Sequence, residues 1–194
     1  MNLQNIIPKN GPAKEEVQKY IKKYVNEIIV IKCGGSVLLN PNLFNQFIED
    51  ISVINKLGLN VIVVHGGGKI IKKKLDEQNI ESNFIDGLRV TDAKTIKIVE
   101  EALTELNSEI IKRLGLKKCK AQPITTKKNN IIITEPEKKE LFFVGKPIEI
   151  EKKNIIQIIK NKEVPVIIPM GIGKDNKVYN INADVAAGAI AKKL

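Results

Sequence analysis

One stretch of the chain, Val61–Lys69, limits the possible folds more than any other, and it reads Val-Ile-Val-Val-His-Gly-Gly-Gly-Lys. Its first four residues are all β-branched and no polar residue alternates with them, which is typical of an interior strand of a parallel sheet. Three glycines follow, and then Ile70, Ile71 and Leu75 recur at helical spacing among lysines. A buried strand, a glycine turn and a helix start form the part of an α/β fold where ligands bind. Because glycine lets the backbone approach a ligand closely, the N–H groups of such a turn favour an anion.

The same arrangement occurs once before, where the aliphatic run Ile28–Lys32 is followed by Gly34 and Gly35. If the two strands are neighbours in one sheet, their glycine turns lie on opposite sides of one cleft. A single pair of glycines is more often an ordinary tight turn, but two copies after all-aliphatic strands favour a binding site. Neither copy has the glycine spacing of a P-loop or a Rossmann fingerprint, so we exclude both of those sites.

Composition limits the functional class. The chain has 194 residues, of which 43% are hydrophobic, enough for one compact domain or a large part of a two-domain enzyme. No run approaches the roughly 18 apolar residues of a membrane span, and Met1–Pro12 lacks the pattern of a secretion signal. Cys33 and Cys119 lack the spacing of metal ligands, so we expect a reduced, cytoplasmic protein without a metal site. The net charge is +10, but nearly all of the basic residues are lysines and only 4% of the residues are aromatic. Nucleic-acid readers rely on arginine contacts and aromatic stacking, so this composition argues against nucleic-acid binding.

Hydrophobic periodicity predicts alternating strands and helices, and therefore an α/β fold with right-handed crossovers and a parallel sheet. We expect helices at residues 12–25, 43–57, 69–78, 92–114, 154–161 and 185–194. We expect strands at residues 28–32, 61–64, 130–134, 141–144 and 164–169. Asp86-Gly87 predicts a turn between short extended pieces, which would form a flap over the cleft. Gly115 is expected to end the long helix, and residues 116–128 to be basic and irregular.

Two basic residues are candidates for ligand binding. Lys32 ends a buried strand beside the first glycine turn, where a cation could bind a transferring phosphoryl group; the alternative is a lysine that reaches solvent. Arg89 is one of only two arginines in a chain that otherwise uses lysine. Its planar fork suits a carboxylate, although most arginines form surface ion pairs. We interpret Arg89 as a ligand-binding residue of the flap.

Three polar residues, Asn180, Asn182 and Asp184, precede the last predicted helix. At least one of them should be a helix cap, but three within a short stretch are more than a cap requires, so they also belong to the candidate site. His65 is the only histidine of the chain. A lone histidine before a glycine turn is more often a hydrogen-bonded strut than a catalytic base, and we expect a strut here.

Six segments resemble the amino acid kinase family and occur in the order found in that family. They are Lys32–Gly35, His65–Gly68, Gly87–Asp92, Phe143–Gly145, Val164–Ile167 and Tyr179–Asp184. The pieces Gly-Leu-Arg-Val-Thr and Asn-Ile-Asn-Ala-Asp are most similar to the acetylglutamate branch. The resemblance implies a three-layer sandwich with a mainly parallel central sheet over residues 27–194. Residues 1–26 resemble the N-terminal helical extension of hexameric, arginine-inhibited members.

The resemblance also implies a reaction, in which ATP phosphorylates the side-chain carboxylate of N-acetyl-L-glutamate during arginine biosynthesis, with Mg²⁺ carried by ATP. The implied catalytic residues are Lys32 and Asp184. The implied phosphate-binding residues are Gly34 and Gly35. The implied substrate-binding residues are Gly67, Gly68, Arg89 and Asn180. Gly35 and Gly67 would donate N–H groups to the phosphoryl group.

Two departures from the family pattern bear on this interpretation. Residues 115–121 replace a glycine-rich loop of the family, and family members continue beyond the last predicted helix into a part that holds most of the ATP site. The chain would then be the acetylglutamate-binding lobe without the nucleotide lobe, so its own turnover is left open. The alternative is a catalytically incomplete acetylglutamate-binding or regulatory module. The flap arginine argues against a third possibility, a family kinase for carbamate, aspartate, glutamate or a nucleotide. We expect a homo-oligomer, a dimer or hexamer assembled through the N-terminal helix, and no nucleic-acid or membrane partner.

Overall fold

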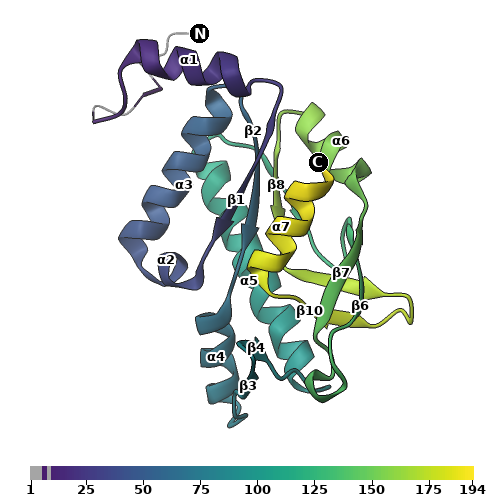
Figure 1. Ribbon diagram of the computed structural model, residues 1–194. Helices are drawn as coiled ribbons and strands as arrows, with labels where there is room; N and C mark the ends of the chain where they lie inside the picture. The colour runs from purple at the N-terminus through teal and green to yellow at the C-terminus, as the bar shows by residue number, and fades with distance from the viewer. Residues whose placement is uncertain (1–5, 8–9) are drawn as a thin grey trace.

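The computed structural model describes residues 6, 7 and 10–194, and a four-stranded sheet lies at its centre (Figure 1). The strands run in the order β1 (Ile28–Cys33), β2 (Asn60–His65), β8 (Val164–Ile167) and β5 (Ala121–Ile124). Every neighbouring pair in this sheet is parallel, as the alternation of strands and helices predicts. The carboxyl ends of β1 and β2 therefore lie side by side, which places the two glycine turns next to each other.

Helices cover both faces of the sheet, so the molecule is the predicted three-layer α/β sandwich (Figure 1). One face packs against α3 (Pro41–Lys56) and α5 (Thr95–Leu116). The other packs against α6 (Lys152–Lys160) and α7 (Ala183–Lys193). Both faces of the strand segment Val61–Val64 are buried, which explains its uninterrupted aliphatic sequence. Val61 and Val63 face the first pair of helices, and Ile62 and Val64 face the second. All four side chains are at most 2% exposed.

A second, mixed sheet packs beside the first. Its strand order is β10 (Val178–Asn180), β9 (Met170–Gly173), β6 (Ile132–Pro136) and β7 (Gly145–Ile150). The strand predicted at residues 141–144 is wrong, because a 3₁₀ helix η2 (Lys139–Leu141) occupies its start and β7 begins only afterwards. Phe142 adopts a positive φ of 54° there, so the backbone turns between two buried anchors, Leu141 and Val144.

Other features also differ from the sequence expectations, among them a missed strand, the end of the long helix and a missed helix. The stretch 116–128 is not irregular throughout, because β5 forms the edge strand of the central sheet. Pro123 argued against a strand in the sequence because proline lacks a backbone N–H, but an edge strand tolerates that loss. Gly115 does not end the long helix, since α5 continues to Leu116. A short helix α2 (Gly35–Leu39), which was not predicted, follows the first glycine pair.

The helix predicted at residues 12–25 is α1 (Lys14–Tyr24), which lies at the opposite end of the sheet from α4 (Gly68–Glu77) in Figure 1. Val17 of α1 is buried, whereas Tyr20 is 47% exposed. Part of the extension expected at residues 1–26, namely residues 1–5, 8 and 9, lies outside the described residues. Among the helices that the structure describes, none combines the length and apolar character needed to cross a membrane.

Candidate active site

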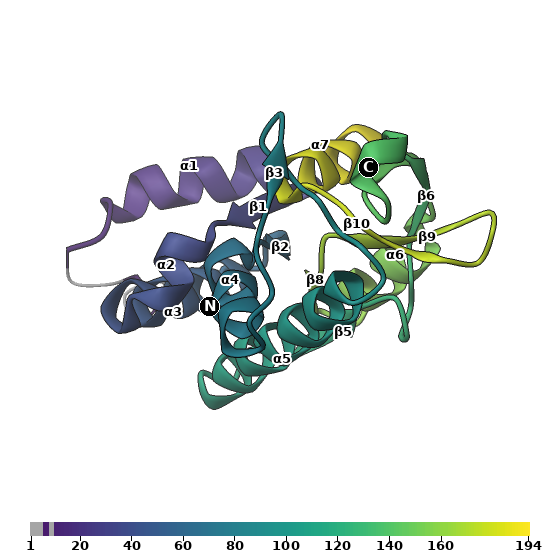
Figure 2. The ribbon, with the colours of Figure 1, turned by 90° about the horizontal axis from the view of Figure 1, so that it is seen from below.

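A cavity of about 220 Å³ opens at the carboxyl ends of β1 and β2. Its lining includes all nine residues assigned to the site from the sequence, which are Lys32, Gly34, Gly35, Gly67, Gly68, Arg89, Asn180, Asn182 and Asp184. They come from four separate segments: the end of β1 with the first glycine turn, the second glycine turn, the flap, and the stretch from the end of β10 to the start of α7. Figure 2 looks onto this end and shows the segment between α4 and α5, which carries the flap, running across it toward α7.

The two glycine turns face each other across the cavity floor. Gly66 N donates a hydrogen bond to the carbonyl oxygen of Cys33 over 2.8 Å, which ties the end of β2 to the end of β1. A Cβ atom added to Gly35 would lie 3.7 Å from the backbone nitrogens of both Gly68 and Lys69. The helices α2 and α4 begin at these turns, so their first N–H groups lack intrahelical acceptors and add positive potential to the cavity.

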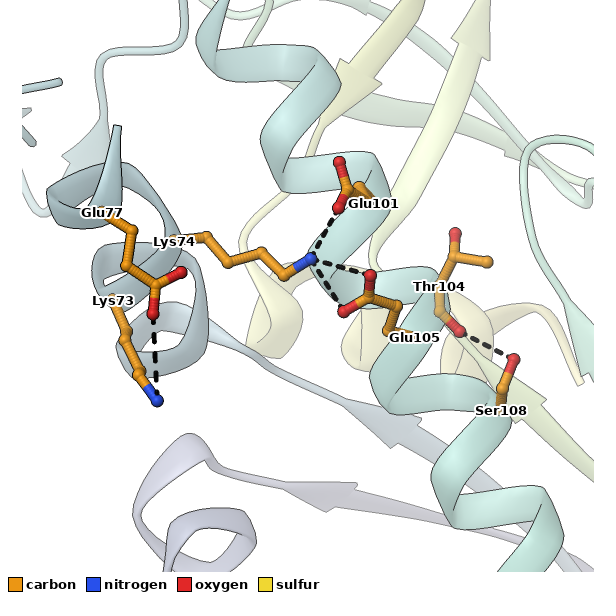
Figure 3. Close-up of polar contacts among 7 residues, drawn as sticks. All are labelled: Lys73, Lys74, Glu77, Glu101, Thr104, Glu105 and Ser108. Atoms are coloured by element: carbon orange, nitrogen blue, oxygen red, sulfur yellow. Dashed lines mark hydrogen bonds and ion pairs between the residues drawn. The ribbon is translucent and has the colours of Figure 1, made fainter. Parts of the chain in front are cut away.

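Gly67 must be glycine because α5 passes directly against it. A Cβ atom at Gly67 would lie 2.7 Å from Cδ2 of Leu103, which is closer than real Cβ contacts allow. Further along α4, Lys74 holds the same two helices together (Figure 3). Its Nζ lies 2.7 Å from a carboxylate oxygen of Glu101 and 2.8 Å from one of Glu105. The start of α4, and with it the second glycine turn, is therefore fixed relative to α5.

Lys32 and Asp184 meet at the cavity rim. The Nζ of Lys32 lies 3.1 Å from Oδ1 of Asp184, and the two side chains are 32% and 72% exposed. Asn182 is the N-cap of α7, since its Oδ1 accepts hydrogen bonds from the N–H groups of Asp184 and Val185. This confirms that at least one of the three polar residues is a cap, and it leaves Asp184 to hold the lysine.

The flap is a hairpin of β3 (Phe84–Ile85) and β4 (Leu88–Arg89), and its turn is the predicted one. Asp86 and Gly87 have φ values of 51° and 78°, the left-handed conformation that Asp-Gly turns supply. Lys138 Nζ lies 2.7 Å from a carboxylate oxygen of Asp86 and so holds the tip of the flap.

Arg89 is only 7% exposed, and its guanidinium lines the cavity. It donates hydrogen bonds to the carbonyl oxygen of Gly68 over 3.0 Å and to Oγ of Ser82, and it lies 4.7 Å from the ring centre of Phe84. All three partners are uncharged. Within the described part of the chain no carboxylate lies within 4.0 Å of this guanidinium, so its positive charge is not neutralised by an ion pair. Burial lowers the pKa of Arg89, but an arginine remains charged in a protein.

Asn180 connects the flap to β10. Its Nδ2 donates to Oγ1 of Thr91 over 3.4 Å, and that hydroxyl donates to the carbonyl oxygen of Arg89 over 2.7 Å. Thr91 is fully buried, so its hydrogen bond to Arg89 is protected from solvent. Sequence reasoning assigned Asn180 to the site but did not recognise Thr91 as the residue between it and the flap.

His65 is fully buried and does not line the cavity. Its ring contacts the carbonyl oxygen of Gly66 through Nδ1 and the side-chain nitrogen of Asn107 through Nε2, at 3.3 and 3.2 Å. Burial lowers the pKa of His65 to about 4, so the ring is neutral near pH 7. These contacts confirm the interpretation of His65 as a strut. Asn107 was missed, although its sequence signal is a polar residue within the apolar stripe of the long helix.

The cavity lining combines two cationic side chains, Lys32 and Arg89, with a single carboxylate, Asp184. The described residues contain no cluster of three or more histidine, cysteine or carboxylate side chains with the geometry to hold a metal ion. Both cysteines are buried and free, and burial raises the pKa of each thiol to about 11. The arrangement therefore suits a ligand with two anionic ends, and it offers charge stabilisation rather than acid–base catalysis.

Known proteins with similar sequences are kinases. A model of the amino acid kinase family matches residues 27–194. The acetylglutamate kinase of Pelagibacter ubique strain HTCC1062 is 58% identical over 192 residues, which are 99% of this chain and 67% of that protein. The acetylglutamate kinase of Petrotoga mobilis is 41% identical over 92% of this chain and 61% of that protein. The chain thus spans about two thirds of the length of the curated relatives that it matches.

Solved structures give the same fold. The smu.665 protein of Streptococcus mutans UA159 has a TM-score of 0.77 and 28% identity, covering 84% of this chain and 67% of that one. An N-acetylglutamate synthase of Neisseria gonorrhoeae has a TM-score of 0.76 at 16% identity, covering 93% of this chain and 43% of that one. The sheet order, the paired glycine turns and the matches over residues 27–194 agree, and this chain belongs to the amino acid kinase family.

Proposed function

We propose that this chain forms the substrate site of an acetylglutamate kinase, in which ATP phosphorylates the side-chain carboxylate of N-acetyl-L-glutamate in arginine biosynthesis. The observation that carries the proposal is the Arg89 guanidinium, which is buried and forms no ion pair with a described carboxylate, in the same cavity as Lys32 and the two glycine turns. A buried charge without a partner is costly, and a ligand carboxylate would offset that cost. The names of the sequence relatives favour acetylglutamate as the source of that carboxylate.

Each end of the substrate has a complementary part of the site. Arg89 would bind the α-carboxylate, with Gly68 and Asn180 beside it. The side-chain carboxylate would point toward Lys32, where it meets ATP. Gly34 shapes the first turn. The N–H of Gly67 would also contact bound acetylglutamate, and the N–H groups of Gly35 and Gly67 would bind the phosphoryl group from either side. The acetamide of the substrate is neutral, which suits a cavity whose one carboxylate already contacts Lys32.

The reaction needs charge stabilisation more than proton transfer. A side-chain carboxylate with an ordinary pKa of about 4.3 is already ionised at neutral pH, so its oxygen can attack the γ-phosphorus of ATP directly. A new P–O bond forms to that oxygen as the bond from the γ-phosphorus to the leaving ADP breaks. Lys32 would stabilise the charge on the transferring group, and Asp184 would hold the lysine in place. His65 is buried and neutral, which agrees with a mechanism that requires no general base.

ATP would enter as co-substrate and carry its own Mg²⁺. We further propose that the protein acts in the cytoplasm, where the buried free cysteines stay reduced, and that α1 takes part in a homo-oligomer.

Calorimetry with N-acetyl-L-glutamate and with L-glutamate tests the substrate. We expect clearly tighter binding of the acetylated compound, because the ammonium group of glutamate would lie in a cavity with two cationic side chains. Equal affinities would contradict the proposed substrate. Release of ADP from ATP, measured with and without N-acetyl-L-glutamate, tests the reaction. Binding without acetylglutamate-dependent ADP release would favour the alternative of a catalytically incomplete binding module.

A further inference from the structure

The imidazole of His65 lies beneath the second glycine turn, and its hydrogen bonds define one tautomer. The carbonyl oxygen of Gly66 can only accept, so the Nδ1 that lies 3.3 Å from it must carry the proton. The side-chain nitrogen of Asn107 can only donate, so the Nε2 that lies 3.2 Å from it must be bare. Both contacts therefore require the same neutral ring, protonated at Nδ1.

The orientation of the Asn107 amide is itself fixed by the backbone. Its Nδ2 also donates to the carbonyl oxygen of Val166 in β8 over 2.9 Å. Reversing the amide would bring two acceptor oxygens together, so the amino group must face both Val166 and His65. Asn107 is 1% exposed, and among the described residues its Oδ1 has no hydrogen-bond partner, so its two bonds within the protein are both made by Nδ2.

The hydrogen bond to Gly66 determines where the next N–H group points. The carbonyl of Gly66 and the N–H of Gly67 belong to one planar trans peptide, in which the two groups point in opposite directions. Because the carbonyl points inward to the buried ring, the N–H of Gly67 points away from the ring, and Gly67 lines the cavity. Among the described residues, no backbone carbonyl accepts this N–H.

We propose that His65 is a positioning residue, and that together with Asn107 it fixes the Gly66–Gly67 peptide so that the Gly67 N–H is directed at the bound anion. The inference rests on the proposed function, because that function supplies the anion. Helix α5 supports the turn from beneath at two points, one helical turn apart. The side chain of Leu103 occupies the space that a Cβ atom on Gly67 would need, and Asn107 contacts His65. A side chain at Gly67 would have to displace Leu103, and the Gly66–Gly67 peptide is held by His65, which Asn107 holds in turn, so α5 supports both constraints on the N–H.

The tautomer can be measured directly, because His65 is the only histidine of the chain. In the ¹⁵N-labelled protein, the imidazole nitrogen spectrum contains a single ring. We expect a protonated Nδ1 and a bare Nε2 between pH 6 and 8. A ring protonated at Nε2, or at both nitrogens, would overturn the proposal. This measurement needs neither ATP nor turnover.

Two substitutions of nearly equal polarity separate positioning from mere packing. In His65→Asn the amide nitrogen is attached at Cγ, as Nδ1 is, and it can still donate to Gly66. In His65→Gln the amide lies farther out, near the Nε2 position, and the donor to Gly66 is lost. We expect His65→Asn to keep N-acetyl-L-glutamate affinity within about 3-fold of wild type and His65→Gln to lose at least about 10-fold, the lower end for a hydrogen bond to a charged group.

Thermal unfolding of both variants provides the control. A purely structural histidine would lower the melting temperature in both and leave the affinity of the folded protein unchanged in both, and that result would overturn the proposal. If wild-type protein shows the Nδ1–H ring but does not bind N-acetyl-L-glutamate, the proposed substrate is wrong. The phosphoryl-binding role of Gly67 is then judged with inorganic phosphate in place of acetylglutamate. Equal phosphate affinity in wild type and His65→Gln would overturn the proposal, and a selective loss in His65→Gln would support it.

Discussion

Arg89 donates a hydrogen bond through Nη2 to the carbonyl oxygen of Gly68 over 3.0 Å, and this contact joins the flap to the second glycine turn. The bond occupies one edge of the guanidinium, and another donor contacts Ser82. The carbonyl of Gly68 therefore orients the arginine while leaving its charge to be neutralised by a ligand. Substrate binding and the position of the flap are linked through this one side chain.

Replacing this arginine should weaken substrate binding more than it weakens the fold. We expect Arg89→Ala to reduce the affinity for N-acetyl-L-glutamate by about 1.5–3 kcal/mol, the scale of a hydrogen bond to a charged group. Arg113→Ala is the control, because the other arginine is half-buried outside the cavity, where it contacts Glu109, Asn45 and the ring of Phe44. Calorimetry measures both variants. If Arg89→Ala binds like wild type, the α-carboxylate is held elsewhere.

Lys32 should contribute to the rate rather than to affinity or stability. Its partner Asp184 is largely exposed, and an exposed ion pair adds at most about 1 kcal/mol to stability. We expect Lys32→Ala to keep the melting temperature and the acetylglutamate affinity close to wild type while lowering any acetylglutamate-dependent ADP release by about 100-fold or more. A large loss of affinity with a small loss of rate would reverse the assignment and make Lys32 a substrate-binding residue.

The position of the site could be predicted from the sequence, because the reason for it is local. Val61–Val64 is apolar on both faces, which only an interior strand tolerates, and parallel neighbours end at the same edge of a sheet. Two such strands with glycine turns therefore place their glycines at the same edge, and the pairing of β1 with β2 brings the two turns together. The flap turn was equally local, since Asp86-Gly87 supplies the two left-handed residues that the hairpin requires.

The parts that escaped prediction depend on contacts between distant segments. Pro123 argues against a strand in isolation, and only the edge position of β5 makes it acceptable. The apolar run at residues 141–144 has the composition of a strand, but Leu141 and Val144 are anchored in the interior and the chain turns between them. The role of Asn107 depends on its contact with His65, which lies far away in the sequence. Periodicity describes one segment at a time and contains no information on such pairings.

Neighbouring glycines of the second turn should respond differently to a methyl group. A Cβ atom at Gly67 would overlap Leu103, whose side chain is 1% exposed and packed in the core, whereas a Cβ atom at Gly68 meets nothing within 4 Å. We expect Gly67→Ala to lower the free energy of unfolding by about 1–3 kcal/mol, as overpacking does. Gly68→Ala should leave it unchanged or raise it slightly, because it removes freedom from the unfolded chain. Urea unfolding compares the two, and equal effects would show that α5 yields easily at Leu103.

The N-terminal helix should take part in assembly. Val17 and Tyr20 line an apolar cavity of about 180 Å³ with Val53 and Leu57, so one side of α1 faces its own subunit. Tyr20 remains 47% exposed beside Tyr24, and their rings stack with centroids 6.2 Å apart. We expect deletion of residues 1–26 to lower the mass measured by light scattering, and Tyr20→Glu to do the same in the full chain. An unchanged mass in both would mean that α1 serves only its own subunit.

Stability should fall in mild acid because of His65. Burial lowers the pKa of the folded-state ring to about 4, below its ordinary value of 6.5. As the pH falls below 6.5, the unfolded chain takes up a proton at this ring that the folded chain does not take up until about pH 4. The unfolded state is therefore favoured progressively over this window, by at most about 1.4 kcal/mol per pH unit.

Carboxylates also titrate in part of the window, so the reference is His65→Asn, which shares every carboxylate but cannot titrate at residue 65. Urea unfolding at several pH values should show wild type losing more stability than the variant between pH 6.5 and 4. Parallel curves would mean that the buried ring accepts a proton as readily as an exposed one, and the neutral tautomer on which the Gly67 orientation depends would then not persist.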